Sequence, residues 1–116
     1  MSETTLIDAG NMAGCLVKDN SNPWVIIFSK TEKVQSGLTY QASYNGNGKH
    51  LITGLENGLY DIHRNGIKIY TKRTTNQNTL YFESTGGQSF QIEKTKERKK
   101  ADRNPLTSGE KLMYFN

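Results

Sequence analysis

Residues 51–70 read LITGLENGLYDIHRNGIKIY, two short runs of alternating apolar and polar residues around Asn65-Gly66. An Asn-Gly pair between such runs predicts a β-hairpin, because both central residues of a type I′ turn have positive φ. The predicted facing pairs are Arg64 with Ile67, His63 with Lys68, Ile62 with Ile69, Asp61 with Tyr70 and Tyr60 with Thr71. This register gathers Tyr60, Ile62, Ile67 and Ile69 on one apolar face.

Several other stretches have the length and pattern of strands. The run Trp24–Ser29 is apolar on both faces, which is typical of a central strand, and we expect it to be the most buried element. Residues 38–44 alternate with a period of two, and Asn45–Gly48 predicts a turn that returns the chain through residues 49–53 as a hairpin.

A last hairpin is predicted between residues 79–84 and 88–93. A three-residue loop, Thr85-Gly86-Gly87, places Phe82 opposite Phe90 and Leu80 opposite Ile92. We therefore expect a bulged turn with a left-handed glycine.

Seven to nine short strands separated by turn signals indicate an all-β fold, an antiparallel β-sandwich of the immunoglobulin-like kind. The predicted organisation is a sandwich domain over residues 1–93, a basic linker over 94–104, and a C-terminal strand within 105–116. Glycine-rich turns argue for strands rather than helices throughout.

Composition narrows the function classes. Cys15 is the only cysteine, which excludes an intrachain disulfide and a cysteine-based zinc site, and we expect it to be buried and inert. The chain shows neither a signal peptide nor an apolar run long enough for a membrane helix, so no membrane partner is expected. It is expected to be cytoplasmic, or extracellular if it is excised from a longer secreted protein.

One segment resembles a known family. Residues 54–62, Gly-Leu-Glu-Asn-Gly-Leu-Tyr-Asp-Ile, are similar to the G-L-x-x-G-x-Y-x-V signature of immunoglobulin-like and fibronectin III-like accessory domains. Together with residues 22–29, Leu80-Tyr-Phe, Gly86-Gly87 and Phe90, the order resembles the β-sandwich that follows the catalytic domain in heparinase II/III-like polysaccharide lyases. The resemblance covers about residues 22–92, although Asn57 stands where that signature often has proline. It implies a scaffold or packing role and transfers no catalytic residue to this chain.

Candidate site residues fall on the predicted hairpin and strands. We assign structural roles to Trp24, Tyr60, Asn65 and Gly66; Tyr60 is expected to bury its ring and bond a backbone group upstream. Asp61, His63 and Tyr70 share the face opposite Ile62, where they form either an exposed polar patch, which we favour, or a base site. We expect no catalytic residue, no metal site at His50 or His63, and no cofactor.

The aromatic residues have two interpretations. Trp24 with Tyr40, Tyr44, Tyr70 and Tyr81 either forms a stacking platform for sugars or belongs to the core, which we favour. Alternation along the strands nevertheless predicts that Tyr70 and Tyr81 are exposed.

The C-terminal region offers two further sites. Residues 93–111 hold seven basic and four acidic residues. A polyanion such as a polysaccharide is one candidate partner, through Lys94, Lys96, Arg98, Lys99, Lys100 and Arg103, although a solubilising tail is the simpler interpretation. An assembly strand of Leu112, Met113, Tyr114 and Phe115 either pairs within the chain or adds to a neighbour's sheet.

These observations favour a non-catalytic β-sandwich module that packs against a parent catalytic domain, another protein or a carbohydrate-related partner. The first alternative is a structural protein that forms homo-oligomers through its C-terminal strand. The second is a polyanion-binding module that uses the basic tail. An enzyme is the interpretation we favour least.

Overall fold

The computed structural model describes residues 2–19 and 23–95, in which every helix or strand is a β-strand. Nine strands follow one another: β1 (Ser2–Ala9), β2 (Met12–Asp19), β3 (Trp24–Ser29), β4 (Gly37–Gln41), β5 (Asn47–Thr53), β6 (Leu59–Arg64), β7 (Ile67–Arg73), β8 (Thr79–Thr85) and β9 (Ser89–Lys94). The predicted all-β class and the range of strand numbers are confirmed.

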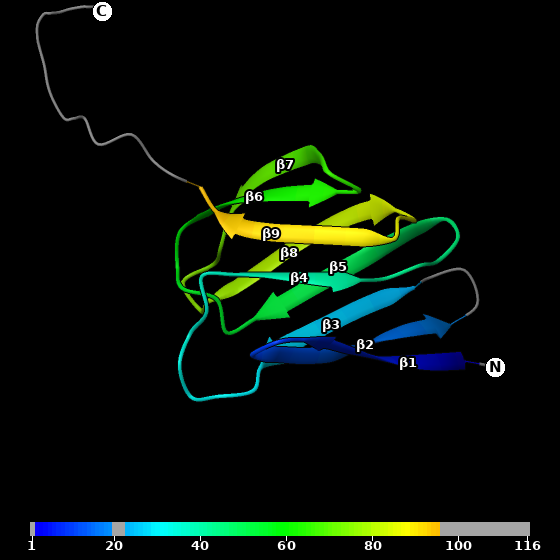
Figure 1. Cartoon of the computed structure of the whole chain (residues 1–116), viewed down its shortest axis with the longest axis horizontal. Coiled ribbons are helices and arrows are strands. Elements are labelled where there is room, and N and C mark those ends of the chain that lie inside the picture. Colours follow the sequence, from blue (N-terminus) through cyan, green and yellow to red (C-terminus); the bar gives the residue numbers. More distant parts are fainter. Residues whose placement is uncertain (1, 20–22, 96–116) are drawn as a thin grey trace, which may run out of the picture.

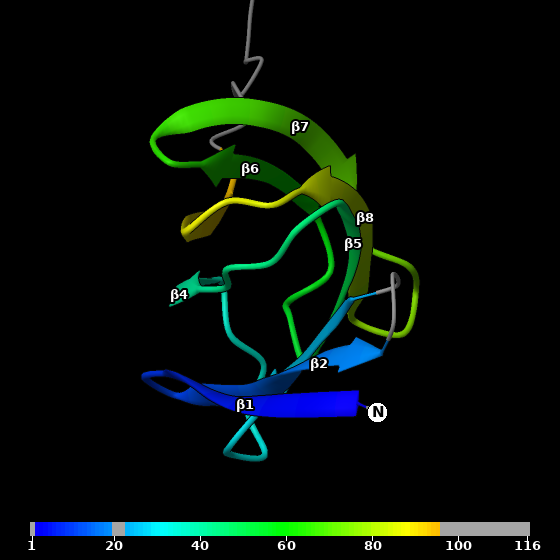
Figure 2. The same ribbon diagram turned by 90° about the vertical axis from the view of Figure 1, so that its right-hand side faces the viewer.

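The strands form two sheets that pack face to face as a β-sandwich (Figure 1). One sheet has the order β1-β2-β3-β5-β8, and the other has the order β4-β9-β6-β7. Figure 2 shows the five-stranded sheet curving from β1 to β8, with β7 closing over its far end. The Tyr70 hydroxyl on β7 donates to the Glu83 carbonyl on β8 at 2.7 Å, so the two sheets meet along this edge.

One pair of neighbouring strands departs from the predicted antiparallel pattern. Strands β3 and β5 run parallel, with Ile26 opposite Leu51. The chain leaves the five-stranded sheet after β3, forms β4 in the other sheet, and then returns as β5. Such a crossover, unlike a tight hairpin, brings the returning strand back in its original direction.

The β6–β7 hairpin turns at Asn65 and Gly66, whose φ angles of 51° and 85° have the sign that a type I′ turn requires. Arg64 faces Ile67 and His63 faces Lys68, as predicted. A bulge then shifts the register by one residue. Beyond it, Ile62 faces Tyr70 instead of Ile69, and the prediction for the outer part of the hairpin is wrong. Ile67, predicted on the apolar face, is 69% exposed.

The predicted hairpin between β8 and β9 is wrong, because the two strands lie in different sheets. β8 pairs with β5, and β9 pairs with β4 and β6. The chain crosses between the layers at Gly86 and Gly87, neither of which has positive φ. The rings of Phe82 and Phe90 do face each other, 6.3 Å apart, but they do so across the core.

The predicted hairpin at Asn45–Gly48 is wrong for the same reason, since β4 and β5 also belong to different sheets. Gly46 has a φ of 80°, and Gly48 packs against the ring of Tyr44, where a Cβ atom would overlap the ring. These glycines therefore carry the chain from one layer to the other.

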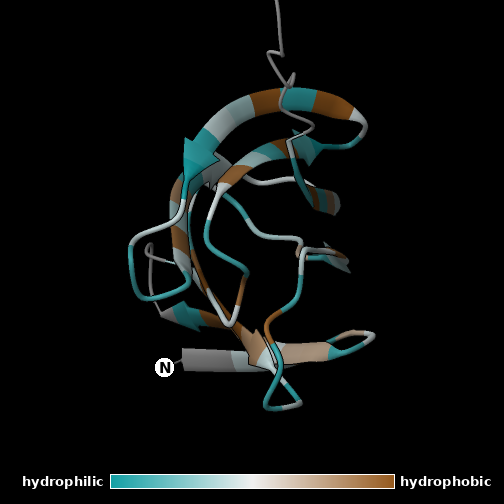
Figure 3. Cartoon of the chain, turned by 90° about the vertical axis from the view of Figure 1, so that its left-hand side faces the viewer, coloured by the Kyte–Doolittle hydropathy of each residue, from teal (hydrophilic) through white to brown (hydrophobic). Residues whose placement is uncertain are grey.

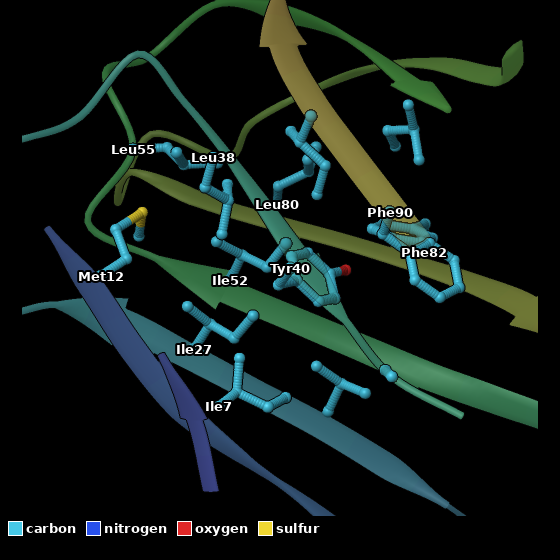
Figure 4. Packing of buried hydrophobic residues seen from close by; sticks show 14 of the residues in the cluster. Ile7, Met12, Ile27, Leu38, Tyr40, Ile52, Leu55, Leu80, Phe82 and Phe90 are labelled. Carbon is cyan, nitrogen blue, oxygen red and sulfur yellow. The ribbon is translucent and has the colours of Figure 1, made fainter. Parts of the chain in front are cut away.

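The core fills the space between the two sheets (Figure 4). Along part of the strand at the top of Figure 3, apolar residues coloured brown alternate with polar residues coloured teal. The side chains with no exposed surface are those of Val25, Ile27, His50, Ile52, Leu55, Tyr60, Ile62, Leu80, Phe82 and Phe90. Inward-facing apolar residues of both layers therefore stabilise the sandwich.

Strand β3 is central in its sheet, as predicted, but only one of its faces is covered. Val25 and Ile27 have no exposed surface, whereas Ile26 and Phe28 are 38% and 52% exposed. The expectation that β3 is the most buried element is wrong for this outer face. An apolar run of this kind predicted that other parts of the protein pack on both faces of the strand. Within the described residues, only the inner face is packed against another layer.

Candidate functional site

Tyr40, His50 and Tyr44 form a hydrogen-bonded chain inside the sandwich. The imidazole Nδ1 lies 2.7 Å from Tyr40 Oη, and Nε2 lies 2.7 Å from Tyr44 Oη. Tyr44 donates its only hydroxyl proton to the Ser84 carbonyl at 3.0 Å, so its oxygen accepts from Nε2–H. Nδ1 then accepts from the Tyr40 hydroxyl. The chain of bonds thus selects a neutral imidazole that is protonated on Nε2.

Aromatic rings enclose this imidazole. Phe82 stacks on it with ring centroids 4.5 Å apart. The Phe90 ring is tilted against it, with ring centroids 4.6 Å apart. Burial lowers the pKa of His50 to about 3 and raises the pKa of Tyr44 to about 12. His50 has no exposed surface, and a general base must come within hydrogen-bonding distance of its substrate. The cluster is therefore a satisfied polar element of the core.

Tyr60 fastens two connecting segments to the sandwich. Its ring is fully buried, and its hydroxyl donates to the Glu56 carbonyl at 2.7 Å, with the Gln35 carbonyl at 3.4 Å. A glycine turn at Gly58 immediately precedes strand β6, and the bonded carbonyl of Glu56 lies just before that turn in the chain. This is the arrangement of a tyrosine corner.

The bulge separates Tyr70 from the polar residues that were predicted to share one face of the β6–β7 hairpin. Asp61 Oδ1 accepts from Thr71 Oγ1 at 2.7 Å and lies 3.7 Å from Lys68 Nζ. The Thr71 hydroxyl is the main cause that lowers the pKa of Asp61. Tyr70, predicted on the same face as Asp61 and His63, instead faces Ile62 because of the bulge, and its ring lies 6.0 Å from Phe82.

The outer face of the five-stranded sheet carries an apolar row that crosses all five strands. The register aligns Leu6, Cys15, Ile26, Leu51 and Tyr81 from β1 to β8. Leu6 is 85% exposed, and Phe28 stands beside the row. We call Leu6, Cys15, Ile26 and Phe28, on β1 to β3, the apolar patch. Cys15 is half-buried in this patch, so the expectation of a buried thiol is wrong.

The outer face of the four-stranded sheet has the opposite chemistry. Across this sheet, from β4 to β7, the register aligns a row of polar residues, Thr39, Gln91, His63 and Lys68. A polar outer face is typical of a sheet that meets water, whereas a contiguous apolar face marks an interaction surface. The two layers therefore differ in what their outer faces can bind.

Surface aromatic rings lie at the β8 end of the apolar row. Trp24 is half-buried on the outer face rather than in the core, which corrects the favoured interpretation for this residue. Its ring lies 6.4 Å from that of Tyr81 at an angle of 45°. Tyr70 and Tyr81 are exposed as predicted, and Tyr40 and Tyr44 are in the core. The sugar platform considered from the sequence is thus reduced to Trp24, Tyr81 and Tyr70.

The model of one protein family, the heparinase II C-terminal domain, matches residues 6–94. The chain belongs to this family. The match covers β2 to β9 entirely and the second half of β1, which is the whole sandwich apart from its first residues. A comparison with curated proteins finds no match. The resemblance to the sandwich of heparinase II/III-like lyases is confirmed.

Most of the predicted C-terminal sites of this heparinase II C-terminal domain lie outside the described residues. Lys94 ends β9, and its Nζ lies 3.2 Å from Glu56 Oε1. The residues outside are Lys96, Arg98, Lys99, Lys100 and Arg103 of the basic run and Leu112, Met113, Tyr114 and Phe115 of the assembly strand. Both sites remain predictions.

Within residues 2–19 and 23–95, no three His, Cys, Asp or Glu side chains gather as a metal site. The same residues contain no helix that is both long and apolar enough to cross a membrane.

The apolar patch was not predicted from the sequence, although a signal for it was present. Trp24–Ser29 is apolar at outward as well as inward positions, and Leu6 stands beside Ile7. A strand that is apolar on both faces needs a layer packed against each face. The two sheets formed by residues 2–19 and 23–95 provide such a layer on only one face of β3.

Proposed function

We propose that this domain is a non-catalytic accessory module of a polysaccharide lyase, and that it packs against the catalytic part of that lyase through the apolar patch. The observation that carries the proposal is the contrast between the outer faces of the two sheets. One is an apolar row across five strands, and the other is polar. The chain belongs to a family of C-terminal domains, and the rest of such a lyase is the partner that we propose for the patch.

The exposed side chains of the patch are large enough to drive such packing. Leu6 and Phe28 are 85% and 52% exposed, and Ile26 is 38% exposed. Full burial of a side chain of this size contributes about 1.5–3 kcal/mol. A few such residues surrounded by polar neighbours suffice for a specific interface.

The absence of a catalytic role is supported by the state of the candidate groups. His50 is closed off by aromatic rings, and Asp61 is bonded to Thr71 on the polar hairpin. His50 is therefore out of reach of a substrate, and the Asp61 carboxylate is already paired with Thr71 and Lys68.

Binding to a lyase catalytic domain tests the proposal. The chain is titrated into the catalytic domain of a heparinase II/III-like lyase from the same genome, with that lyase's own C-terminal domain removed, and affinity is measured by calorimetry. The double variant Ile26→Thr/Phe28→Ser should bind at least about tenfold more weakly. The matched control, Thr39→Ala/Gln91→Ala on the opposite sheet, should bind like wild type. Equal affinities for the two variants, or lyase activity in the isolated chain, would contradict the proposal.

The two alternatives derived from the sequence are assembly through the C-terminal strand and polyanion binding through the basic tail. Apart from Lys94, they rest on residues outside those described. They predict an oligomer or a polyanion complex that survives the Ile26→Thr/Phe28→Ser changes.

A further inference from the structure

Two aromatic rings with a lysine at each end lie over β3, β5, β8 and β7. Lys49 Nζ on β5 lies 5.3 Å from the centroid of the Trp24 ring, and Lys72 Nζ on β7 lies 6.0 Å from that of Tyr81. Both distances are those of cation–π contacts. We call Lys49, Trp24, Tyr81 and Lys72 the cationic strip.

Hydrogen bonds hold the strip in place. Glu83 Oε2 accepts from the Tyr81 hydroxyl at 2.7 Å, and Oε1 accepts from the Asn47 amide at 2.8 Å. The Tyr81 hydroxyl is also the main cause that lowers the pKa of Glu83. Lys72 lies 5.8 Å from the Tyr70 ring as well, which ties β7 to the strip. Two ammonium groups face a single carboxylate whose oxygens are already bonded, so the strip keeps a net positive charge.

We propose that the cationic strip binds an acidic polysaccharide, a chain of uronic acid or sulfated sugars. Aromatic rings offer apolar surface to the C–H groups of a pyranose, and the flanking ammonium groups form charge-assisted hydrogen bonds with carboxylate or sulfate. A neutral glycan would leave the net positive charge of the strip without a counter-charge.

Single-stranded nucleic acid is the other polyanion that binds rings and cations. A stacked base needs a whole ring face, but Lys49 lies over the face of Trp24 and Lys72 over that of Tyr81. A pyranose contacts a ring through a few C–H groups, so it can share the ring with the lysine ammonium group. The carboxylate or sulfate of the sugar then pairs with that ammonium group. The geometry therefore favours the polysaccharide.

This inference goes beyond the packing role proposed above. The strip runs over β3, β5, β8 and β7, and it shares strand β3 but no residue with the apolar patch on β1 to β3. It also uses different cations from the basic tail. Each of the three interactions can therefore fail without the others.

Tryptophan fluorescence tests the strip directly, because Trp24 is the only tryptophan in the chain. The full chain is titrated at low salt with heparin oligosaccharides and with polygalacturonate oligomers, and Trp24 emission is followed. The variants are Lys49→Ala/Lys72→Ala in the strip, Glu83→Gln beside it, and Lys68→Ala on β7 as a control for loss of charge. A further variant replaces Lys96, Arg98, Lys99, Lys100 and Arg103 by alanine. Circular dichroism verifies that each variant is folded.

At least one of the two acidic ligands should change the Trp24 emission on binding. Loss of both lysines should weaken its affinity about tenfold or more, since charge-assisted hydrogen bonds are lost. Lys68→Ala should change affinity less than about twofold, and Glu83→Gln should tighten binding by removing a negative charge. The tail variant should keep the Trp24 response. The proposal is overturned by unchanged emission at saturation, by full affinity in Lys49→Ala/Lys72→Ala, by loss of the response in the tail variant, or by tighter binding of a single-stranded DNA oligomer.

Discussion

His50 Nε2 lies 2.7 Å from the hydroxyl oxygen of Tyr44 inside the β-sandwich. Tyr44 in turn donates to the Ser84 carbonyl, which lies on the neighbouring strand β8. Every proton in this chain of bonds has one acceptor, so loss or addition of a single proton leaves a buried polar group unpaired. An unpaired buried polar group is costly, which makes the cluster a sensitive point for stability.

Acid should therefore destabilise the domain through His50. Its folded-state pKa of about 3 lies below the unfolded value of 6.5, so the unfolded state binds the proton first as the pH falls. The contribution of His50 to the free energy of unfolding is full above the unfolded pKa and is lost progressively between pH 6.5 and 3. From pH 7 to pH 5 the loss should reach about 2 kcal/mol, measured by urea denaturation.

The control for this pH dependence is a change at the other histidine. His63→Gln should retain the fall in stability between pH 7 and pH 5, whereas His50→Gln should flatten it. An equal slope in wild type and His50→Gln would show that the buried imidazole is not the cause.

Tyr44→Phe should destabilise the fold by about 1–3 kcal/mol, because it removes the acceptor of His50 Nε2–H and the donor to the Ser84 carbonyl. Tyr70→Phe is the matched control. Tyr70 also donates to a backbone carbonyl, that of Glu83, but it is 39% exposed, so water can replace the lost bond and the cost should stay below about 1 kcal/mol. Chemical denaturation of the two variants at pH 7 compares them, and equal losses would argue against the buried network.

Gly86→Ala should destabilise the passage between the layers. A Cβ atom at this position would overlap the carbonyl oxygen of Tyr44, so the main chain must move. We expect a loss of about 2 kcal/mol or more in the free energy of unfolding. Thr85→Ala, at the exposed neighbouring position, should cost far less. Thermal unfolding of both variants measures the difference, and a Gly86→Ala protein as stable as wild type would refute the close approach.

Removal of the exposed phenylalanine should have a different signature. Phe28→Ser replaces a side chain that is 52% exposed, so the stability of the isolated chain should change by less than about 1 kcal/mol. Binding of a dye specific for apolar surface should decrease at the same time. A large loss of stability would mean that Phe28 belongs to the fold rather than to an interface.

Local patterns in the sequence predicted local structure well. The Asn65-Gly66 turn and the first facing pairs beside it depend on residues only a few positions apart, and they are present as predicted. Alternation also identified inward positions such as Ile62 and Phe82, because the two faces of a strand differ in burial. These features follow from backbone geometry and burial alone.

The choice of partner strand could not be predicted in the same way. Phe82 and Phe90 were predicted to pair within one sheet, and the structure joins them across two. Alternation reports which side of a strand is buried, but a neighbour in the same sheet and one in the opposite sheet both satisfy it. A glycine-rich connection suits a hairpin and a crossing between layers alike.

The role of His50 was also missed, although its position held a clue. His50 follows Gly48 and precedes Ile52 on the inward-facing side of β5, where a polar residue needs a buried partner. Tyr40 and Tyr44 also occupy inward positions, four residues apart in the sequence. Only the packing of the two layers brings their hydroxyls to the imidazole.

The rate at which a thiol reagent labels Cys15 tests the central claim most directly. Cys15 is the only cysteine of the chain and lies in the apolar patch between Leu6 and Ile26. If the patch is the packing surface, addition of the lyase catalytic domain should slow the labelling at least about tenfold, because the reagent then reaches the thiol only in the dissociated fraction. An unchanged rate under conditions where calorimetry shows the complex to be formed would contradict the account.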